Sequence, residues 1–167
     1  MRSKSPVELA QLLVQVGLAD TDKIVGCSAA EISELEQRFS VALPAAYKQF
    51  LQVMGKQAGE FLVDASWLYP LNSARQDAEE MLLSDQQRKG KPTFEISALD
   101  FVFLCSDSFF LFFRTESVSD DPVIFIYEEG AMQPKKFYSS FSEWLSTCAE
   151  HDAKTYKEHS DWKLKAH

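Results

Sequence analysis

Near the start of the chain, apolar residues recur at the spacing of one helix face in three separate segments. The first two segments open with a capping box, in which a serine and a glutamate three positions later satisfy each other's backbone N–H groups. The third follows Pro44 and ends at Gly55, two residue types that suit the ends of a helix. We therefore predict helices over residues 5–16, 28–39 and 44–54, whose apolar faces are Leu9, Leu12, Leu13 and Val16, then Ile32, Leu35 and Phe39, then Tyr47, Phe50, Leu51 and Met54.

The next part of the chain has a weaker pattern. Residues 60–71 mix aliphatic and aromatic side chains, which predicts a short strand and a packed turn ending near Pro70. Asn72 or Ser73 is a suitable cap for a helix that runs to about Leu83. The polar residues 84–92 then indicate an exposed loop.

Apolar runs after Phe94 indicate β-strands. Residues 101–105 and 109–113 flank three polar residues, which predicts an antiparallel hairpin. Residues 123–127 predict a third strand, and Phe137 belongs to a short strand at the edge. Because the runs are apolar at every position, we expect both faces of this sheet to be covered. A last helix is predicted from a capping box of Ser140 and Glu143, with the apolar stripe Phe141, Trp144, Leu145 and Cys148.

This order of elements predicts an α+β fold. We expect a single domain with a mostly antiparallel sheet, packed by N-terminal helices and a closing C-terminal helix. Within it, residues 1–25 form an N-terminal helix and linker, residues 26–150 the α+β domain, and residues 151–167 a polar C-terminal tail. Tyr156 and Trp162 of this tail are candidates for packing back onto the body.

Charge is distributed unevenly along the chain. The whole sequence has a formal net charge of −8, and residues 61–130 carry five basic and thirteen acidic side chains, so this middle part alone accounts for −8. An acidic middle argues against nucleic-acid binding, which depends on clustered Lys and Arg. It is compatible with a basic protein partner, whose approach it would accelerate. The alternative is an acidic surface that serves solubility alone.

The residues that most often carry chemistry form no recognisable motif. Cys27, Cys105 and Cys148 are far apart and include no CxxC pair, which predicts buried, reduced thiols and a reducing compartment. The histidines lie near the end of the chain, eight residues apart, and neighbours would be about 12 Å apart on a helix, too far to share a metal. No Gly-rich phosphate loop or GxSxG elbow is present. We predict no catalytic, cofactor-binding or metal-binding residues.

The N-terminal apolar stretch is not expected to be a signal peptide or a membrane span. Glu8, Gln11 and Gln15 interrupt it, and its apolar residues follow helical spacing. We therefore expect a cytoplasmic protein that does not contact a membrane.

Several motifs resemble one known family. The capped helix of residues 26–36 is followed by Leu43-Pro44, Tyr47 and Phe50-Leu51, then by Asp121-Pro122-Val123 with Tyr127-Glu128, and by the segment from Ser140 to Leu145. In this order and spacing they resemble the SUKH (Smi/Knr-like) superfamily, over roughly residues 26–147. The sequence departs from that pattern at Met54-Gly55, where Asn-Gly is common, and at Ser106-Asp107-Ser108, where a glycine-bearing turn is expected.

The resemblance implies a non-catalytic protein-binding domain. Bacterial members are commonly immunity proteins that neutralise a cognate polymorphic toxin, often a nuclease, by direct binding. Eukaryotic relatives act as regulatory interaction proteins. We therefore expect an immunity protein with a basic toxin as its partner, and keep a regulatory or scaffold protein with a non-toxin partner as the alternative. An enzyme with a carboxylate or a distant Cys/His site is a third and weaker possibility.

Acidic residues near the turns are the candidate contacts for such a partner, together with two aromatic anchors. For each of them the alternative is a structural role, with the acids solvated and the aromatic rings in the core. The predicted contacts are Asp107, Glu116, Asp120, Asp121, Glu128 and Glu129, with Trp67 and Tyr69 as the anchors.

Overall fold

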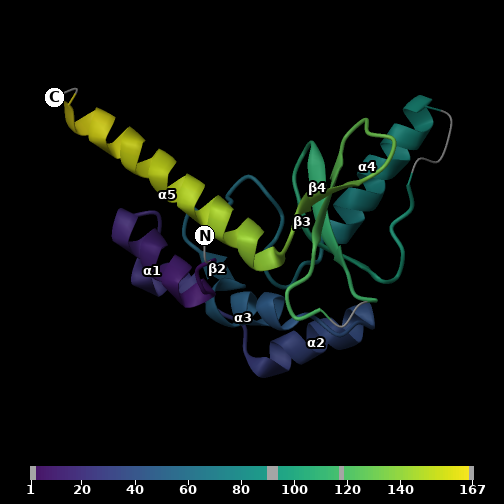
Figure 1. Cartoon of the computed structure of the whole chain (residues 1–167), viewed down its shortest axis with the longest axis horizontal. Helices are drawn as coiled ribbons and strands as arrows, with labels where there is room; N and C mark the ends of the chain where they lie inside the picture. Colours follow the sequence, from purple (N-terminus) through teal and green to yellow (C-terminus); the bar gives the residue numbers. More distant parts are fainter. Residues whose placement is uncertain (1–2, 90–93, 117–118, 166–167) are drawn as a thin grey trace.

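The structure is a computed structural model that describes residues 3–89, 94–116 and 119–165, except for the side chains of Lys89 and of residues 160–165. It confirms the predicted α+β fold (Figure 1). In chain order the elements are α1 (Pro6–Val16), a 3₁₀ turn (Thr21–Lys23), β1 (Ile24–Val25), α2 (Ala29–Phe39), α3 (Ala45–Met54), β2 (Gln57–Ala58), α4 (Ala74–Lys89), β3 (Asp100–Cys105), β4 (Phe109–Arg114), β5 (Ile124–Glu128), β6 (Lys135–Tyr138) and α5 (Phe141–Lys165).

The main sheet is an antiparallel meander in the order β3-β4-β5-β6. The predicted hairpin is confirmed, with Cys105 paired to Phe110 on either side of the turn at residues 106–108. Phe137 lies in the edge strand β6, also as predicted. At the opposite edge, Ser66 forms two backbone hydrogen bonds with Cys105, of 2.7 and 3.0 Å. The short strands β1 and β2 pair with each other as a separate antiparallel ribbon.

Helices cover both faces of the sheet, as the continuous apolar runs predicted. On one face the Tyr47 ring of α3 contacts Phe101 and Phe113, with centroids 5.5 and 5.3 Å away. Trp144 of α5 packs edge-on against Phe103 on that same face, at 5.0 Å. The opposite face lies against α4, which Figure 1 shows behind the strands. The core is therefore largely aromatic, and Tyr47 lies fully buried at its centre.

The helix starts follow the predicted capping chemistry, with one difference. Complete capping boxes open α1 and α2. At the start of α5 the hydroxyl of Ser140 accepts the N–H of Glu143 at 3.2 Å, but the Glu143 carboxylate accepts the N–H of Ser139 at 3.0 Å. The Glu143 carboxylate therefore caps the N–H of Ser139, one residue before the Ser140 N–H that a capping box would use.

Two predictions in the middle of the chain were wrong. Residues 84–89 continue helix α4 and are not a loop, while residues 90–92 lie outside the described residues. The buried stripe of α4 consists of Ala74, Ala78, Leu82 and Asp85. Because the last of these is charged, the apolar pattern predicts a helix that ends near Leu83, before its actual end. The strand expected within residues 60–71 is reduced to the single bridge at Ser66.

Helix α5 does not end near residue 150. Residues 151–165, expected to be a polar tail, continue it, so that α5 projects from the body as a long arm (Figure 1). Ala149 and Ala153 are buried along its inner side, and Tyr156 packs against the core. The side chain of Trp162 lies outside the described residues.

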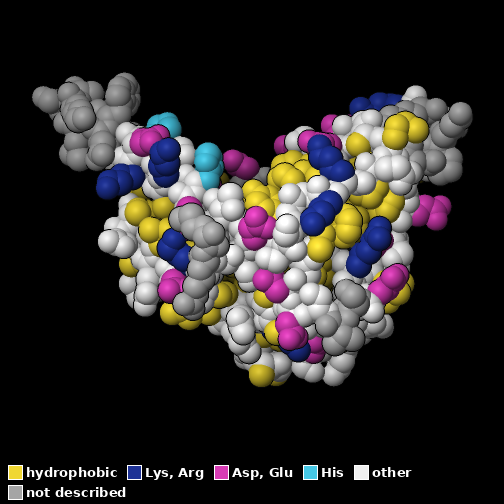
Figure 2. Space-filling model, viewed as in Figure 1, with side chains coloured by type: hydrophobic (Ala, Val, Ile, Leu, Met, Phe, Trp, Pro, Cys, Tyr) yellow, Lys and Arg dark blue, Asp and Glu magenta, His cyan; other side chains and the backbone are white. Residues whose placement is uncertain are grey.

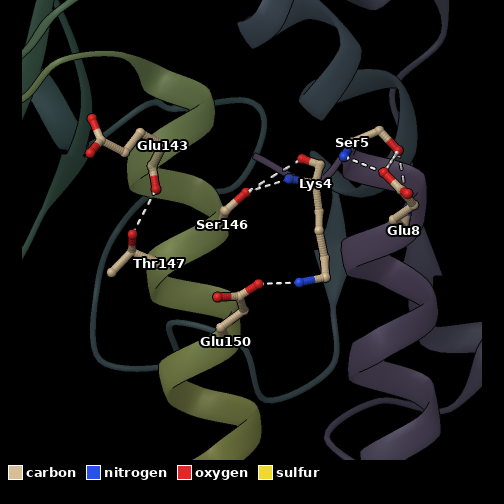
Figure 3. A network of polar contacts seen from close by, with 7 residues as sticks. All are labelled: Lys4, Ser5, Glu8, Glu143, Ser146, Thr147 and Glu150. Carbon is tan, nitrogen blue, oxygen red and sulfur yellow. Dashed lines mark hydrogen bonds and ion pairs between the residues drawn. The ribbon is translucent and has the colours of Figure 1, made fainter. Parts of the chain in front are cut away.

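Polar contacts hold the beginning of α1 against α5 (Figure 3). The Lys4 backbone N–H donates to the Ser146 hydroxyl at 2.9 Å, and the Lys4 ammonium group forms an ion pair with Glu150. Leu9 and Leu13, the fully buried apolar residues of α1, extend this contact into the core. The position of the α5 arm is thus set partly by α1.

Candidate protein-binding surface

The predicted acidic contacts near residue 120 differ in solvent exposure and in hydrogen bonding. Glu116 and Asp120 are exposed. Asp121 is half-buried, and its carboxylate accepts the backbone N–H of Ser142 at 2.9 Å in the first turn of α5. A carboxylate at a helix N-terminus stabilises the helix, so Asp121 has a structural role that the sequence did not indicate.

Glu128 and Glu129 are exposed, but both are paired with basic residues of the same chain. Glu128 forms an ion pair with Lys135 on the neighbouring strand. The Glu129 carboxylate lies 2.6 Å from the guanidinium group of Arg88, and this pairing raises the pKa of Arg88. Because their charges are offset locally, these two residues attract a basic partner less than free carboxylates would.

A buried carboxylate beneath this pair was not anticipated. Asp85 of α4 is only 1% exposed, and its side chain accepts hydrogen bonds from the Tyr127 hydroxyl at 2.7 Å and the Gly130 N–H at 2.8 Å. It also lies 2.7 Å from Arg88. Asp85 therefore joins α4 to the end of β5 and supports the Arg88–Glu129 pair.

Asp107 lies at the exposed tip of the β3–β4 turn and borders a groove. The groove consists of two adjoining cavities of about 510 and 520 Å³, which share the residues 63–65 and 106–107. Its walls come from the 60–66 loop, the β3–β4 turn, the first half of α4 and α5. We call it the acidic groove, because five carboxylates line it: Glu60, Asp64, Asp77, Asp107 and Asp152.

No basic side chain of the described residues lines the acidic groove, and none of its five acids forms an ion pair there. Burial raises the pKa of the Asp152 carboxyl group, although hydrogen bonding to the Leu62 backbone and the charge of His151 partly oppose the change. Figure 1 shows α5 and the sheet with α4 as two arms of a V, and Figure 2 shows the surface hollowed between them. The carboxylates that line this concave surface thus have no ion-pair partner among the described residues.

The two predicted aromatic anchors lie in different surroundings. Trp67 is 4% exposed, its Nε1–H donates to the Leu62 carbonyl at 3.0 Å, and its ring packs on Phe50 and Phe61. Its ring is therefore not presented to a partner. Tyr69 is half-buried, and its hydroxyl lies 3.4 Å from a carboxylate oxygen of Glu34. Neither aromatic residue lines the acidic groove.

The three cysteines are free thiols, with Cys27 and Cys105 buried and Cys148 half-buried. Burial raises the pKa of the first two thiols to about 11 and that of Cys148 to about 12. Within the described residues, no three His, Cys, Asp or Glu side chains are grouped so that they could hold a metal ion. The same part of the chain has no helix that combines the length and apolar character of a membrane span.

Comparison with known proteins places the chain in a family. No curated protein matches it. A model of the SMI1 / KNR4 family (SUKH-1) matches residues 26–147, which include α2, α3, α4, the whole main sheet and the start of α5. Helix α1 and the outer part of α5 lie outside the matched region. The match covers most of the chain, and the chain therefore belongs to the SMI1 / KNR4 family (SUKH-1).

Proposed function

We propose that this protein is a non-catalytic immunity protein, which neutralises a cognate toxin in the cytoplasm by direct binding. Membership of the SUKH family is compatible with this role. The observation that carries the proposal is the acidic groove, where carboxylates without basic partners surround a concave surface. Toxins that act on nucleic acid carry basic surfaces, and an acidic inhibitor can occupy them.

Binding and catalysis predict different stoichiometries, which gives a direct test. A candidate toxin, such as a basic protein encoded beside this gene, is titrated with the purified chain, and the remaining toxin activity is measured after short and long incubation. An inhibitor that acts by tight binding removes activity in proportion to its amount, reaching zero near one molecule per toxin at both times. Loss of activity at far lower ratios, increasing with time, would refute the non-catalytic part of the proposal.

Protection of living cells completes the test. Cells that produce the toxin together with this chain should grow, whereas cells that produce the toxin alone should not. If the chain neither binds nor protects, and housekeeping or assembly proteins are retained by it instead, the regulatory alternative replaces the immunity proposal.

A further inference from the structure

We infer that the acidic groove holds a segment of the partner protein that carries Lys or Arg side chains, inserted between the 60–66 loop, the β3–β4 turn and α5. The inference rests on the proposed function, since it identifies the surface and the chemistry by which the partner is recognised. It assigns no role to the ion-paired acids Glu128 and Glu129.

The shape of the groove suits a segment of chain. Its two cavities share the lining residues 63–65 and 106–107, so an extended segment that lies over these residues contacts both. The cavity beside α5 has an apolar lining that includes Leu62, Leu104 and Phe109. Val63 projects into solvent beside it with 65% of its surface exposed.

The mixture of apolar and acidic lining matches the chemistry of long basic side chains. Lys and Arg bury their aliphatic stems against apolar surface while their charged heads reach polar groups. The stems fit against Leu62, Val63 and Phe109, and the heads reach carboxylates such as Asp64 and Asp107. Hydrogen bonds between such heads and carboxylates are among the stronger ones in proteins.

The negative charge of the groove favours an occupant of positive charge. Five carboxylates lie on its walls, and no Lys or Arg of the described residues stands among them. Nucleic acid, which is itself negatively charged, is therefore repelled. A basic segment removes the repulsion among these carboxylates, and it offsets the unfavourable burial of Asp152.

One wall of the groove lies outside the region matched to the family. Asp152 follows residue 147, and the stretch of α5 that carries it packs against α1 and pairs through Glu150 with Lys4, just before α1. The family core thus supplies the loop, the turn and α4, while the additions at both ends supply the last wall. Recognition of the basic segment consequently depends in part on a wall that lies outside the region matched to the family.

The test uses the full chain, labelled with ¹⁵N, and two synthetic octapeptides, one rich in Lys, Arg and Leu and one in which Glu replaces every basic residue. Backbone amide shifts are followed by NMR. The basic peptide should shift the amides of residues 60–66, 106–109 and around Asp152, and the acidic peptide should shift none of them. Shifts that appear elsewhere, or that are the same for both peptides, would overturn the inference.

A matched pair of variants tests the carboxylates themselves. Asp64→Asn with Asp107→Asn neutralises two exposed acids of the groove, whereas Asp20→Asn with Asp22→Asn makes the same charge change at exposed acids elsewhere. The groove variant should bind the basic peptide about 10-fold more weakly, and the control should remain within about 2-fold of the original chain. Equal affinities in a groove variant whose melting temperature is unchanged would also overturn the inference.

The two proposals fail in different ways. If the chain neutralises its toxin but the groove variant does so equally well, the groove is not the binding surface and the proposed function stands. If the basic peptide binds in the groove but no toxin is neutralised, the proposed function fails and the recognition chemistry stands.

Discussion

The buried carboxylate of Asp85 offers the sharpest test of how this fold is held together. Replacing it with alanine removes an acceptor of the Gly130 N–H at 2.8 Å and one of the Tyr127 hydroxyl at 2.7 Å, which leaves that hydroxyl only the Ala131 carbonyl at 3.0 Å among the contacts described. Hydrogen bonds to a charged group contribute about 1.5–3 kcal/mol each. The Arg88 pair adds little, because the Arg88 side chain is 57% exposed. Relief from burying the carboxylate offsets part of this sum, which leaves a net loss of about 3 kcal/mol in the free energy of unfolding.

The measurement is chemical denaturation of the wild type, Asp85→Ala, Tyr127→Phe and the double variant. A loss of about 3 kcal/mol corresponds to a melting temperature lower by about 6 to 12 °C for a chain of this length. Tyr127→Phe alone should cost about 1.5 kcal/mol, since it leaves the Gly130 contact intact. The double variant should be more stable than the sum of the single losses predicts, by about 1 kcal/mol or more.

The control is Asp85→Asn, which keeps the volume and one acceptor oxygen, and should cost about half as much as the alanine variant. A loss below about 1 kcal/mol for Asp85→Ala would contradict the reasoning, because a carboxylate so well buried would then contribute nothing through its hydrogen bonds. Additive effects of the Asp85 and Tyr127 substitutions would contradict it as well.

Three further predictions concern the core and the thiols. Trp144→Ala should lower the free energy of unfolding by about 3 to 5 kcal/mol, because Trp144 is 3% exposed and packs on Phe103; a loss below about 1 kcal/mol in denaturation would show that the closing helix is held elsewhere. The Tyr47 hydroxyl is buried and has no hydrogen-bond partner among the described residues, so Tyr47→Phe should raise stability by about 1 kcal/mol in the same assay, and a loss would mean that the hydroxyl is bonded after all. Burial moves the pKa of Cys27 from 9.0 to about 11, so its thiolate fraction at pH 8 is lower by about 100-fold, and mass spectrometry should find alkylation slow in the native protein and fast in urea.

Elements with strong periodic patterns were predicted correctly from the sequence. The strands β3 and β4 follow from two apolar runs on either side of Ser106-Asp107-Ser108, since a short polar interruption between such runs favours a hairpin. The elements with weaker patterns were not predicted at their full length, for identifiable reasons. The buried face of α4 uses Ala74, Ala78 and finally Asp85, so its apolar signal fades before its end. The outer part of α5 likewise buries small side chains such as Ala153, which carry little hydrophobic signal.

The candidate surface was less predictable, because it depends on distances between elements. Acidity and position near turns selected Asp107, which the structure places at an exposed turn beside the groove. The same criteria also selected Glu128 and Glu129, whose partners Lys135 and Arg88 are brought to them only by the strand register and by α4. Asp64 and Asp152 were not singled out, because nothing in their spacing of nearly ninety residues indicates that they face one groove.

The contact between α1 and α5 also determines when, during synthesis, the protein can finish folding. Lys4 and Glu150 lie 146 residues apart, and a ribosome that adds about 5–20 residues per second needs roughly 7 to 30 s to make the second after the first. During this interval Leu9 and Leu13 lack one of the two helices that bury them, so part of the apolar face of α1 stays exposed on the nascent chain. The docking of α1 against α5 therefore has to follow the synthesis of α5, and the α5 wall of the groove, steadied by α1, takes its final place only after that.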